Sequence, residues 1–318
     1  MPNNNENTTH WLLGGSLLLV ALLATAIVFI KSQADTTTVT TSTEITNSPP
    51  VVDSVYFSST DDNFLSNSFS SDLTPGTTTR MYITGIVHDD NSETDINNLY
   101  ATFYRSSQTC TEVGHADENY CYYVATSSCV IDATGGTPLD ANYYCPIDLS
   151  YYTDSTEAGG EFPSEHWVGF VQVEDDSGAT GSLEASTTIN TLLALNVPST
   201  GINYGDLGTG ATSSDLVITL TQQGNDRADV ELSGTDMICD GDGSDNIGVG
   251  QQAWAIATAT PHSSKTPFTT SSTPANIDVS YRTDDEVSKD LYWSIQIPSF
   301  GVRGTCTGTN TITVAPQL

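Results

Sequence analysis

The chain contains few basic residues. It has 8 Lys and Arg residues against 39 Asp and Glu residues, which gives a formal net charge of −31 at pH 7. A field of this sign repels phosphate backbones, so nucleic acids are excluded as partners. It attracts cations such as Ca²⁺; the simpler interpretation is solubility and mutual repulsion at a crowded or saline surface.

The sequence also lacks the common catalytic motifs. It contains no G-x-S-x-G, no H-E-x-x-H and no G-x-x-x-x-G-K-[ST]. No histidine belongs to a visible nucleophile–base set, and His166, next to Trp167, is expected to be an exposed strand residue. Carboxylate pairs are too frequent in this chain for a glycosidase pair to stand out. We therefore expect a protein that is not an enzyme.

Only one hydrophobic run is long. Residues 11–30 carry no charge and are long enough to span a bilayer, with Trp11 and Lys31 at its two ends. The run predicts a single-pass transmembrane anchor behind a short tail, residues 1–10. A cleaved signal peptide is the alternative, because "ATA" at 24–26 resembles a cleavage site. The absence of Lys and Arg before the run and its continuation beyond 26 favour the anchor.

Residues 31–50 form a Thr- and Ser-rich segment that is too polar to build a core. We interpret it as a stalk, either O-glycosylated or bare. Lys31 alone favours the opposite orientation, but six cysteines, few lysines and the Thr-rich flank indicate that the bulk of the chain lies outside the cell. The predicted localisation is the cell membrane, with an extracellular C-terminal ectodomain.

Short alternating segments follow between turn signals, and they predict an all-β fold. One set of seven lies at 51–57, 80–87, 98–104, 121–128, 143–152, 166–173 and 181–189. A second set lies at 202–207, 215–222, 228–234, 253–260, 276–282, 291–297 and 310–316. Each set fits one β-sandwich, which gives two tandem domains, 51–192 and 193–318.

The cysteines divide evenly between these domains. Cys110, Cys121, Cys129 and Cys145 lie in the first, and Cys239 and Cys306 lie in the second. Even counts outside a membrane predict disulfides. Of three pairings for the first four, Cys110–Cys121 and Cys129–Cys145 are favoured because each closes a local loop, and Cys239–Cys306 follows by elimination. Zinc is the competing interpretation, but no C-x₂₋₄-C pair is present.

Parts of the first domain show a family resemblance. The stretch "ITGIVHDDNSETDINNLYATFY" resembles the early strand–turn–strand of immunoglobulin-like domains in archaeal and bacterial surface proteins. Ser92 stands where those domains have Gly. The stretch "HWVGFVQVEDDSG" is similar to their later Trp-containing strand and turn. The matching positions of the first stretch are Asp89, Asp90, Asn91, Asp95 and Ile96.

The second domain resembles β-sandwich domains that carry "YGxLxxG" followed by a "TNxGN" turn. Gln222 replaces the usual Asn of that turn. The matching positions are Gly205, Leu207, Gly210, Gly224 and Asn225. These resemblances imply extracellular immunoglobulin-like sandwiches, and they imply no reaction.

Acidic turns of the first domain are candidates for binding Ca²⁺. Asp89, Asp90 and Asp95 follow one predicted strand, and Asp175 and Asp176 follow another. In an immunoglobulin-like order these turns meet at one end of the sandwich, where a hard cation relieves the repulsion between carboxylates. The alternative is that turns simply prefer Asp and Asn for their backbone hydrogen bonds.

A second candidate is "CDGDGSDNIG", residues 239–248. Asp240 and Asp242 fall at positions one and three of a twelve-residue calcium loop. Asp245 stands where the loop needs Gly, and Gln251 stands where it needs Glu, so the stretch is not an EF-hand. A looser Ca²⁺ site at Asp240 and Asp242 is the remaining hypothesis.

Together these features predict a membrane-anchored, structural or adhesive cell-surface protein. One alternative is a self-assembling subunit of an S-layer or filament. Another is a receptor whose exposed tyrosines bind glycans, although packing over the disulfides explains the same residues. Its expected partners are the membrane, further copies of itself, other surface proteins and glycans. The tyrosines in question are Tyr122, Tyr123, Tyr143 and Tyr144.

Overall fold

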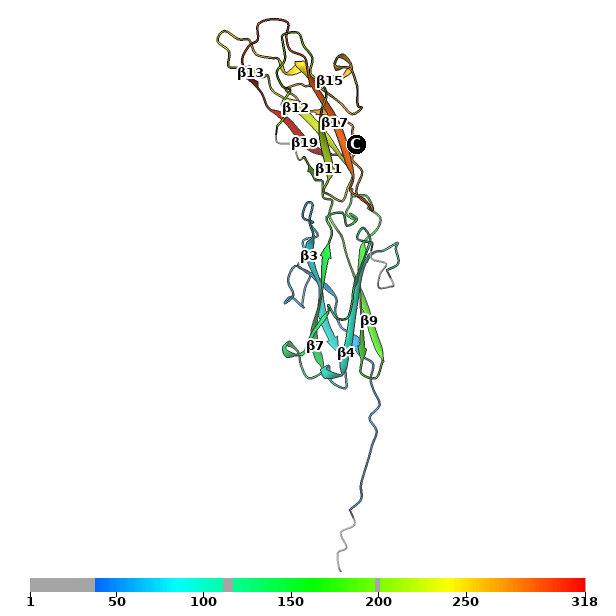
Figure 1. Ribbon diagram of the computed structural model, residues 1–318. Helices are drawn as coiled ribbons and strands as arrows, with labels where there is room; N and C mark the ends of the chain where they lie inside the picture. The colour runs from blue at the N-terminus through cyan, green and yellow to red at the C-terminus, as the bar shows by residue number, and fades with distance from the viewer. Residues whose placement is uncertain (1–37, 111–116, 198–200, 318) are drawn as a thin grey trace, which may run out of the picture. The chain divides into compact units, whose positions relative to one another are not determined.

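The computed structural model describes residues 38–110, 117–197 and 201–317 (Figure 1). Within these ranges the protein is all-β, as predicted: it has strands in five sheets, short 3₁₀ turns and no α-helix. None of the described helical segments has the length and apolar character needed to cross a bilayer. The anchor predicted at 11–30 lies outside the described residues.

The chain divides into two units, Met1–Thr46 and Asn47–Leu318. In the first unit, residues 38–46 have no regular secondary structure and their side chains are exposed. The second unit contains all the sheets that the structure describes.

Two sheets that share one core form the first part of this unit, here called the N-terminal sheet pair. One sheet has the order β1-β3-β7-β6, and β2 also pairs with β3. The other has the order β5-β4-β8-β9. The strands of the first sheet are β1 (Val51–Val52), β2 (Tyr56–Ser58), β3 (Thr79–His88), β6 (Val130–Asp132) and β7 (Asp140–Leu149). Those of the second are β4 (Ile96–Arg105), β5 (Cys121–Val124), β8 (Trp167–Asp175) and β9 (Thr180–Thr187).

Alternating side chains of these strands build the shared core. Trp167, on β8, is fully buried and stacks on Phe103 of β4 with 4.6 Å between ring centroids. Its Nε1 donates a hydrogen bond to the Asp154 carbonyl oxygen at 2.9 Å, so the indole buries its apolar area without losing its polar partner. Met81 and Ile83 of β3 complete the opposite wall of the core.

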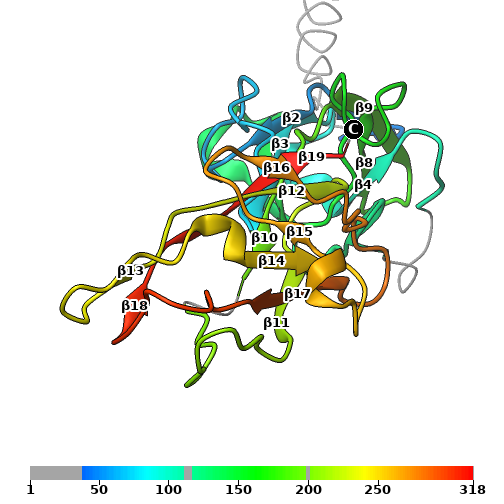
Figure 2. The ribbon, with the colours of Figure 1, turned by 90° about the horizontal axis from the view of Figure 1, so that it is seen from above.

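The remaining strands form the C-terminal sheet set, which has its own hydrophobic core. Its sheets have the orders β10-β11-β17-β14-β15 and β16-β12-β19, together with the β13-β18 ladder (Figure 2). The five strands of the first sheet are β10 (Leu195–Asn196), β11 (Leu216–Gln222), β14 (Gln252–Ala255), β15 (Thr266–Pro267) and β17 (Ser288–Ile295). The other strands are β12 (Ala228–Gly234), β13 (Ile238–Cys239), β16 (Thr273–Pro274), β18 (Cys306–Thr307) and β19 (Asn310–Pro316). In the described residues the 3₁₀ turns are η1 (Glu93–Asp95), η2 (Ala133–Gly135), η3 (Val249–Gln251) and η4 (His262–Ser264).

All three predicted disulfides are confirmed. The bonds join Cys110 to Cys121, Cys129 to Cys145, and Cys239 to Cys306. Cys239 and Cys306 lie directly opposite each other in the β13-β18 ladder, so the third disulfide crosslinks the two strands at a paired position.

Two predicted strands are not formed. Residues 276–282 make only an isolated bridge at Val279, because Asn276 and Asp278 have φ of 53° and 52°, in the left-handed region that interrupts a strand. Residues 202–207 form a loop in which Gly205 has φ of 75°. In both cases residues with positive φ interrupt the extended backbone that a ladder requires.

Candidate functional site

The acidic turns of the N-terminal sheet pair end in carboxylates that point inward. Ile83, Val87 and Asp89 have the same parity along β3 and its continuation, and all are buried. Asp175 likewise follows Val171 and Val173 on the inward face of β8. Because side chains alternate between the two faces of a strand, both carboxylates lie beneath the end of the sheets rather than in solvent.

Asp95, in η1, completes a group of three with these two residues. One carboxylate oxygen from each of Asp89, Asp95 and Asp175 lies within 4.8 Å of the others. Asp89 is 0 % exposed and Asp175 is 1 % exposed, while Asp95 is half-buried. The sequence prediction named all three residues, and the structure brings them together from turns that are far apart in the chain.

Hydrogen bonds satisfy part of this cluster and leave one atom without a partner. Asp89 Oδ1 accepts from the Asn91 backbone N–H at 2.7 Å, and Asp175 Oδ1 accepts from the N–H groups of Ser177 and Ala179, each at 2.8 Å. Asp175 Oδ2 accepts from Asn47 Nδ2 at 2.7 Å. Asp89 Oδ2 is buried without a hydrogen-bond partner. Since buried polar atoms are normally paired, the cluster lacks a hydrogen-bond donor or a cation at this oxygen.

In the described chain, no basic side chain balances the negative charge of the cluster. Within the described ranges no Lys, Arg or His forms an ion pair with any of its three members. Burial, together with repulsion from Asp89, Asp175 and Asp176, raises the pKa of Asp95 above its ordinary value. The hydrogen bond from Asn47 and those from backbone N–H groups lower the pKa of Asp175. The cluster therefore combines negative charge, partial burial and no basic counter-charge.

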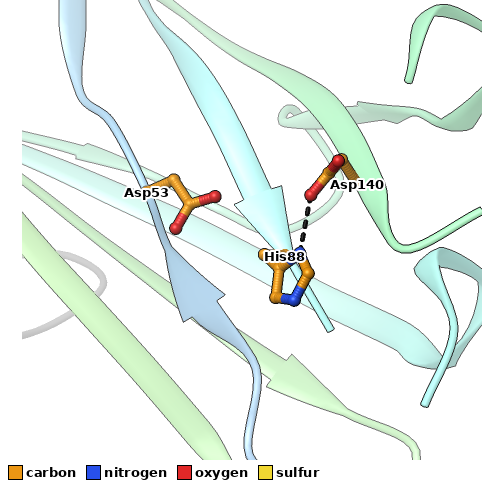
Figure 3. Close-up of side chains that lie close together, drawn as sticks. All are labelled: Asp53, His88 and Asp140. Carbon is orange, nitrogen blue, oxygen red and sulfur yellow. Dashed lines mark hydrogen bonds and ion pairs between the residues drawn. The ribbon is translucent and has the colours of Figure 1, made fainter. Parts of the chain in front are cut away.

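A second group of potential ligands, Asp53, His88 and Asp140, lies nearby (Figure 3). His88 Nδ1 lies 2.6 Å from Asp140 Oδ1, and Nε2 lies 3.1 Å from Asp90 Oδ1. These carboxylates raise the pKa of His88, with the Asp140 hydrogen bond as the largest cause. Both ring nitrogens are already occupied, so this group is an ion-paired histidine rather than an open metal site.

The other predicted calcium ligands are not part of a cluster of three. Asp90 pairs with His88 and is largely exposed. Asp176 is exposed, and its N–H donates to the Asp95 carbonyl oxygen at 2.9 Å. Asp240 and Asp242 are exposed and, within the part of the chain that the structure describes, belong to no group of three metal-binding side chains. Asp240 Oδ1 instead accepts from the Thr305 N–H at 2.6 Å, which closes the loop beside the Cys239–Cys306 disulfide.

Aromatic side chains gather on the outer face of the β5-β4-β8-β9 sheet. Tyr100 of β4 stacks on Tyr123 of β5 with centroids 6.1 Å apart, and Phe170 of β8 lies 6.3 Å from Tyr100. With Tyr104 they line a pocket of 330 Å³. All four are half-buried, on a face where solubility alone would favour small polar residues.

Polar groups surround this aromatic surface. Tyr100 Oη donates to Gln172 Oε1 at 2.5 Å, and Tyr104 Oη donates to Glu184 Oε1 at 3.3 Å. Gln108 also lines the pocket. Flat apolar rings next to oriented hydrogen-bonding groups are a typical combination in small-molecule sites.

The structure divides the four tyrosines of the glycan hypothesis. Tyr122 and Tyr143 are buried, so packing explains them. Tyr144 is half-buried and contacts Tyr82 edge-on on the other sheet. Only Tyr123 belongs to the aromatic pocket. Tyr100, Tyr104 and Phe170 were missed. Tyr100 and Tyr104 lie four residues apart on one face of β4, and Phe170 lies on β8 opposite Thr102, so their proximity is visible once the strands are placed.

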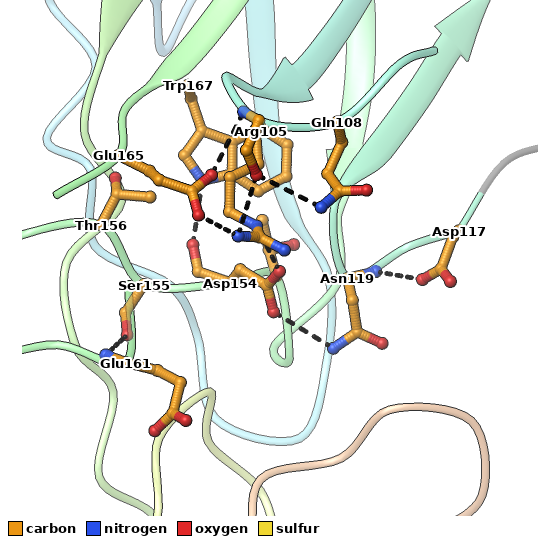
Figure 4. A network of polar contacts seen from close by, with 12 residues as sticks. Arg105, Gln108, Asp117, Asn119, Asp154, Ser155, Thr156, Glu161, Glu165 and Trp167 are labelled. Carbon is orange, nitrogen blue, oxygen red and sulfur yellow. Dashed lines mark hydrogen bonds and ion pairs between the residues drawn. The ribbon is translucent and has the colours of Figure 1, made fainter. Parts of the chain in front are cut away.

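A buried polar network, which the sequence did not reveal, holds the loop before β8 (Figure 4). Arg105 Nη1 donates to Glu165 Oε1 at 2.5 Å, and Arg105 Nε lies 2.9 Å from Asp154 Oδ2 without hydrogen-bond alignment. The guanidinium lies 3.7 Å from the centroid of the Phe162 ring. Burial raises the pKa of Asp154 to about 7. Arg105, Asp154 and Glu165 do not line the aromatic pocket, and their burial and mutual contacts are those of an interior anchor.

Comparison with known proteins identifies no family. No protein-family model matches the chain, and no curated protein matches it. A chain in a structure of the chaperone–tip adhesin complex of CFA/I fimbriae is 12% identical over 82% of this chain and 84% of that chain, with a TM-score of 0.31. The CupB6 tip adhesin of Pseudomonas aeruginosa is 10% identical over 83% of this chain and 93% of that chain, with a TM-score of 0.26.

Proposed function

We propose that the protein is a non-catalytic, adhesive cell-surface protein whose aromatic pocket binds glycans. In this proposal the predicted anchor at 11–30 and the Thr-rich stalk at 31–50 hold the sheets away from the membrane. The observation that carries the proposal is the pocket formed by Tyr100, Tyr104, Tyr123 and Phe170 on an outer sheet face.

The chemistry of the pocket favours a neutral sugar. Its rings offer flat apolar faces to the C–H groups of a pyranose, and Gln108 and Glu184, which also line the pocket, offer hydrogen-bonding groups. A net charge of −31 opposes the approach of anionic ligands. Uncharged glycans therefore fit the site better than sulfated or sialylated ones.

The strand order supports the surface-protein part of the proposal. The orders β1-β3-β7-β6 and β5-β4-β8-β9 correspond to immunoglobulin-like sheets A-B-E-D and C′-C-F-G. Such modules with disulfides are typical of extracellular proteins. We extend the assignment to the C-terminal sheet set as the second module, with the boundary at residues 192/193.

A glycan array probed with the full-length chain and a Tyr123→Ala variant tests the proposal. The wild type is expected to bind at least one neutral glycan, and the variant to bind it about 2- to 12-fold more weakly, the range of a single aromatic contact. Tyr144→Ala is the matched control, because it removes a half-buried tyrosine from the other sheet and should leave binding unchanged. A blank array, or equal losses in the two variants, would reject the glycan site. Electron microscopy of the same sample separates the alternative of a self-assembling subunit, which would form lattices or filaments without glycan.

A further inference from the structure

We propose that Asp89, Asp95 and Asp175 bind one Ca²⁺ ion, which fastens the first residues of the second unit, Asn47–Leu318 (the compact unit), to the end of the N-terminal sheet pair. This proposal is independent of glycan binding, since the cluster shares no residue with the aromatic pocket.

The need for a cation follows from burial and charge. Asp89 is fully buried and Asp175 nearly so, yet in the described chain neither has a basic partner. A buried carboxylate without a counter-charge is strongly unfavourable unless it is paired or binds a metal. Arg105 and Lys265, the bases buried in the described chain, are engaged elsewhere: Arg105 pairs with Glu165, and Lys265 Nζ lies 2.5 Å from Asp215 Oδ1.

The second observation is the Asp89 Oδ2 atom, which is inaccessible to solvent and has no hydrogen-bond donor. It belongs to a carboxylate of the three-member group. Acidic turns that merely solubilise a protein point their oxygens into water. Here the parity of β3 directs Asp89 inward, and a bound ion would supply the partner that the protein does not provide.

The ligand set selects a hard cation of the size of Ca²⁺. All three donors are carboxylate oxygens, which Ca²⁺ and Mg²⁺ prefer, whereas zinc favours nitrogen and sulfur. Oxygens on opposite sides of a Ca²⁺ ion are about 4.8 Å apart, twice a typical Ca–O distance. The oxygens of the cluster lie within 4.8 Å of one another. Mg²⁺ retains several waters and is usually held by only one or two carboxylates, so a set of three carboxylates fits Ca²⁺ better.

The same turns bind the first residues of the compact unit. Asn47 Nδ2 donates to Asp175 Oδ2, and the Ser48 N–H donates to Asn91 Oδ1, each at 2.7 Å. Asp175 therefore contacts both the proposed ion and Asn47. Binding of Ca²⁺ would fix the orientation of Asp175 and with it the chain at Asn47, where the compact unit begins. Ca²⁺ would thus stiffen the start of the folded unit.

The test is a thermal unfolding series on the full-length chain, first stripped with EDTA and then titrated with CaCl2, with MgCl2 at matched ionic strength as the reference. Wild type is expected to show a saturable Tm increase on the order of 5 °C with Ca²⁺ and a clearly smaller one with Mg²⁺. Asp95→Asn should lose the difference between the two salts. Its side chain makes no hydrogen bond within the described structure, so this variant should still fold.

Two further variants keep the result interpretable. Asp89→Asn retains the acceptor for the Asn91 N–H and removes a buried charge, so in EDTA it should be at least as stable as wild type while no longer responding to Ca²⁺. Asp176→Asn, an exposed acid of the same turn, should respond like wild type. The proposal is overturned if Ca²⁺ and Mg²⁺ have equal effects on wild type, or if Asp89→Asn and Asp95→Asn keep the full Ca²⁺ response.

Discussion

Arg105 Nη1 lies 2.5 Å from Glu165 Oε1 in the interior of the N-terminal sheet pair, and the side chains are 8 % and 18 % exposed. The same guanidinium faces Asp154, whose side chain is 3 % exposed. Arg105 thus interacts with one buried and one half-buried acid, and the Glu165 Oε2 atom accepts from the Ser107 N–H at 3.2 Å. This arrangement joins the end of β4 to the loop that leads into β8.

Replacing Arg105 should be far more harmful than replacing an exposed arginine. Arg105→Ala leaves Asp154 and Glu165 without a counter-charge, and we expect a loss of about 3–5 kcal/mol in the free energy of unfolding. Arg80→Ala is the control, because Arg80 and Asp148 form a pair that is about half exposed, and its loss should stay below about 1 kcal/mol. Urea denaturation of both variants measures the difference. Similar losses would show that the buried network is not an anchor.

Asp154 should also give the protein a specific pH dependence. Burial raises its folded-state pKa to about 7, against about 3.9 in an unfolded chain. Between these values the folded state binds more protons than the unfolded state. The contribution of Asp154 to stability is therefore greatest below pH of about 4 and is lost as pH rises towards about 7.

Asp154→Asn isolates this effect from the other carboxylates. As pH rises from about 4 to about 7, wild type should lose stability relative to the variant. The difference in unfolding free energy should change by at most about 1.4 kcal/mol per pH unit. Above that window the difference should become constant. Unfolding curves at several pH values provide the measurement. A difference that does not change across the window would mean that Asp154 is ionised throughout.

The contrast between Asp89 and Arg105 shows what the sequence could predict. Asp89 follows a strand whose apolar residues define its parity, so both its inward direction and its meeting with Asp175 follow from local pattern and turn order. Two disulfides were predictable for a similar reason, because Cys110–Cys121 and Cys129–Cys145 each close a local loop, and Cys239–Cys306 then followed by elimination. Local pattern also located most strands, since alternation is a property of short stretches.

The partners of Arg105 had no such signal. Glu165 is 60 residues away, and its approach depends on how the loop before β8 folds over the end of β4. In so acidic a chain, an Asp or Glu that lies close to a basic residue in the sequence does not indicate an ion pair. The aromatic pocket was partly missed for the same reason: Tyr123 and Phe170 meet only through their separate pairings with β4.

Asn225, by contrast, connects a sequence motif to a testable structural role. It is 1 % exposed, and its Oδ1 accepts from the Leu192 N–H at 2.7 Å. Its Nδ2 donates to the carbonyl oxygens of Thr153 at 2.8 Å and Asn190 at 3.0 Å. The side chain therefore uses both its donor and its acceptor functions to satisfy backbone groups of the N-terminal sheet pair and of the segment that follows it.

Asn225→Ala should lower the free energy of unfolding by about 1–3 kcal/mol, because backbone groups lose their partners in a buried place. Asn225→Asp should be worse: it keeps the acceptor for Leu192 but places a carboxylate against the two carbonyl oxygens that Nδ2 now serves. Asn246→Ala, at an exposed asparagine, is the control and should change stability by less than about 0.5 kcal/mol. Thermal unfolding of the three variants ranks them. If Asn225→Asp were as stable as wild type, the amide donor would have no structural role.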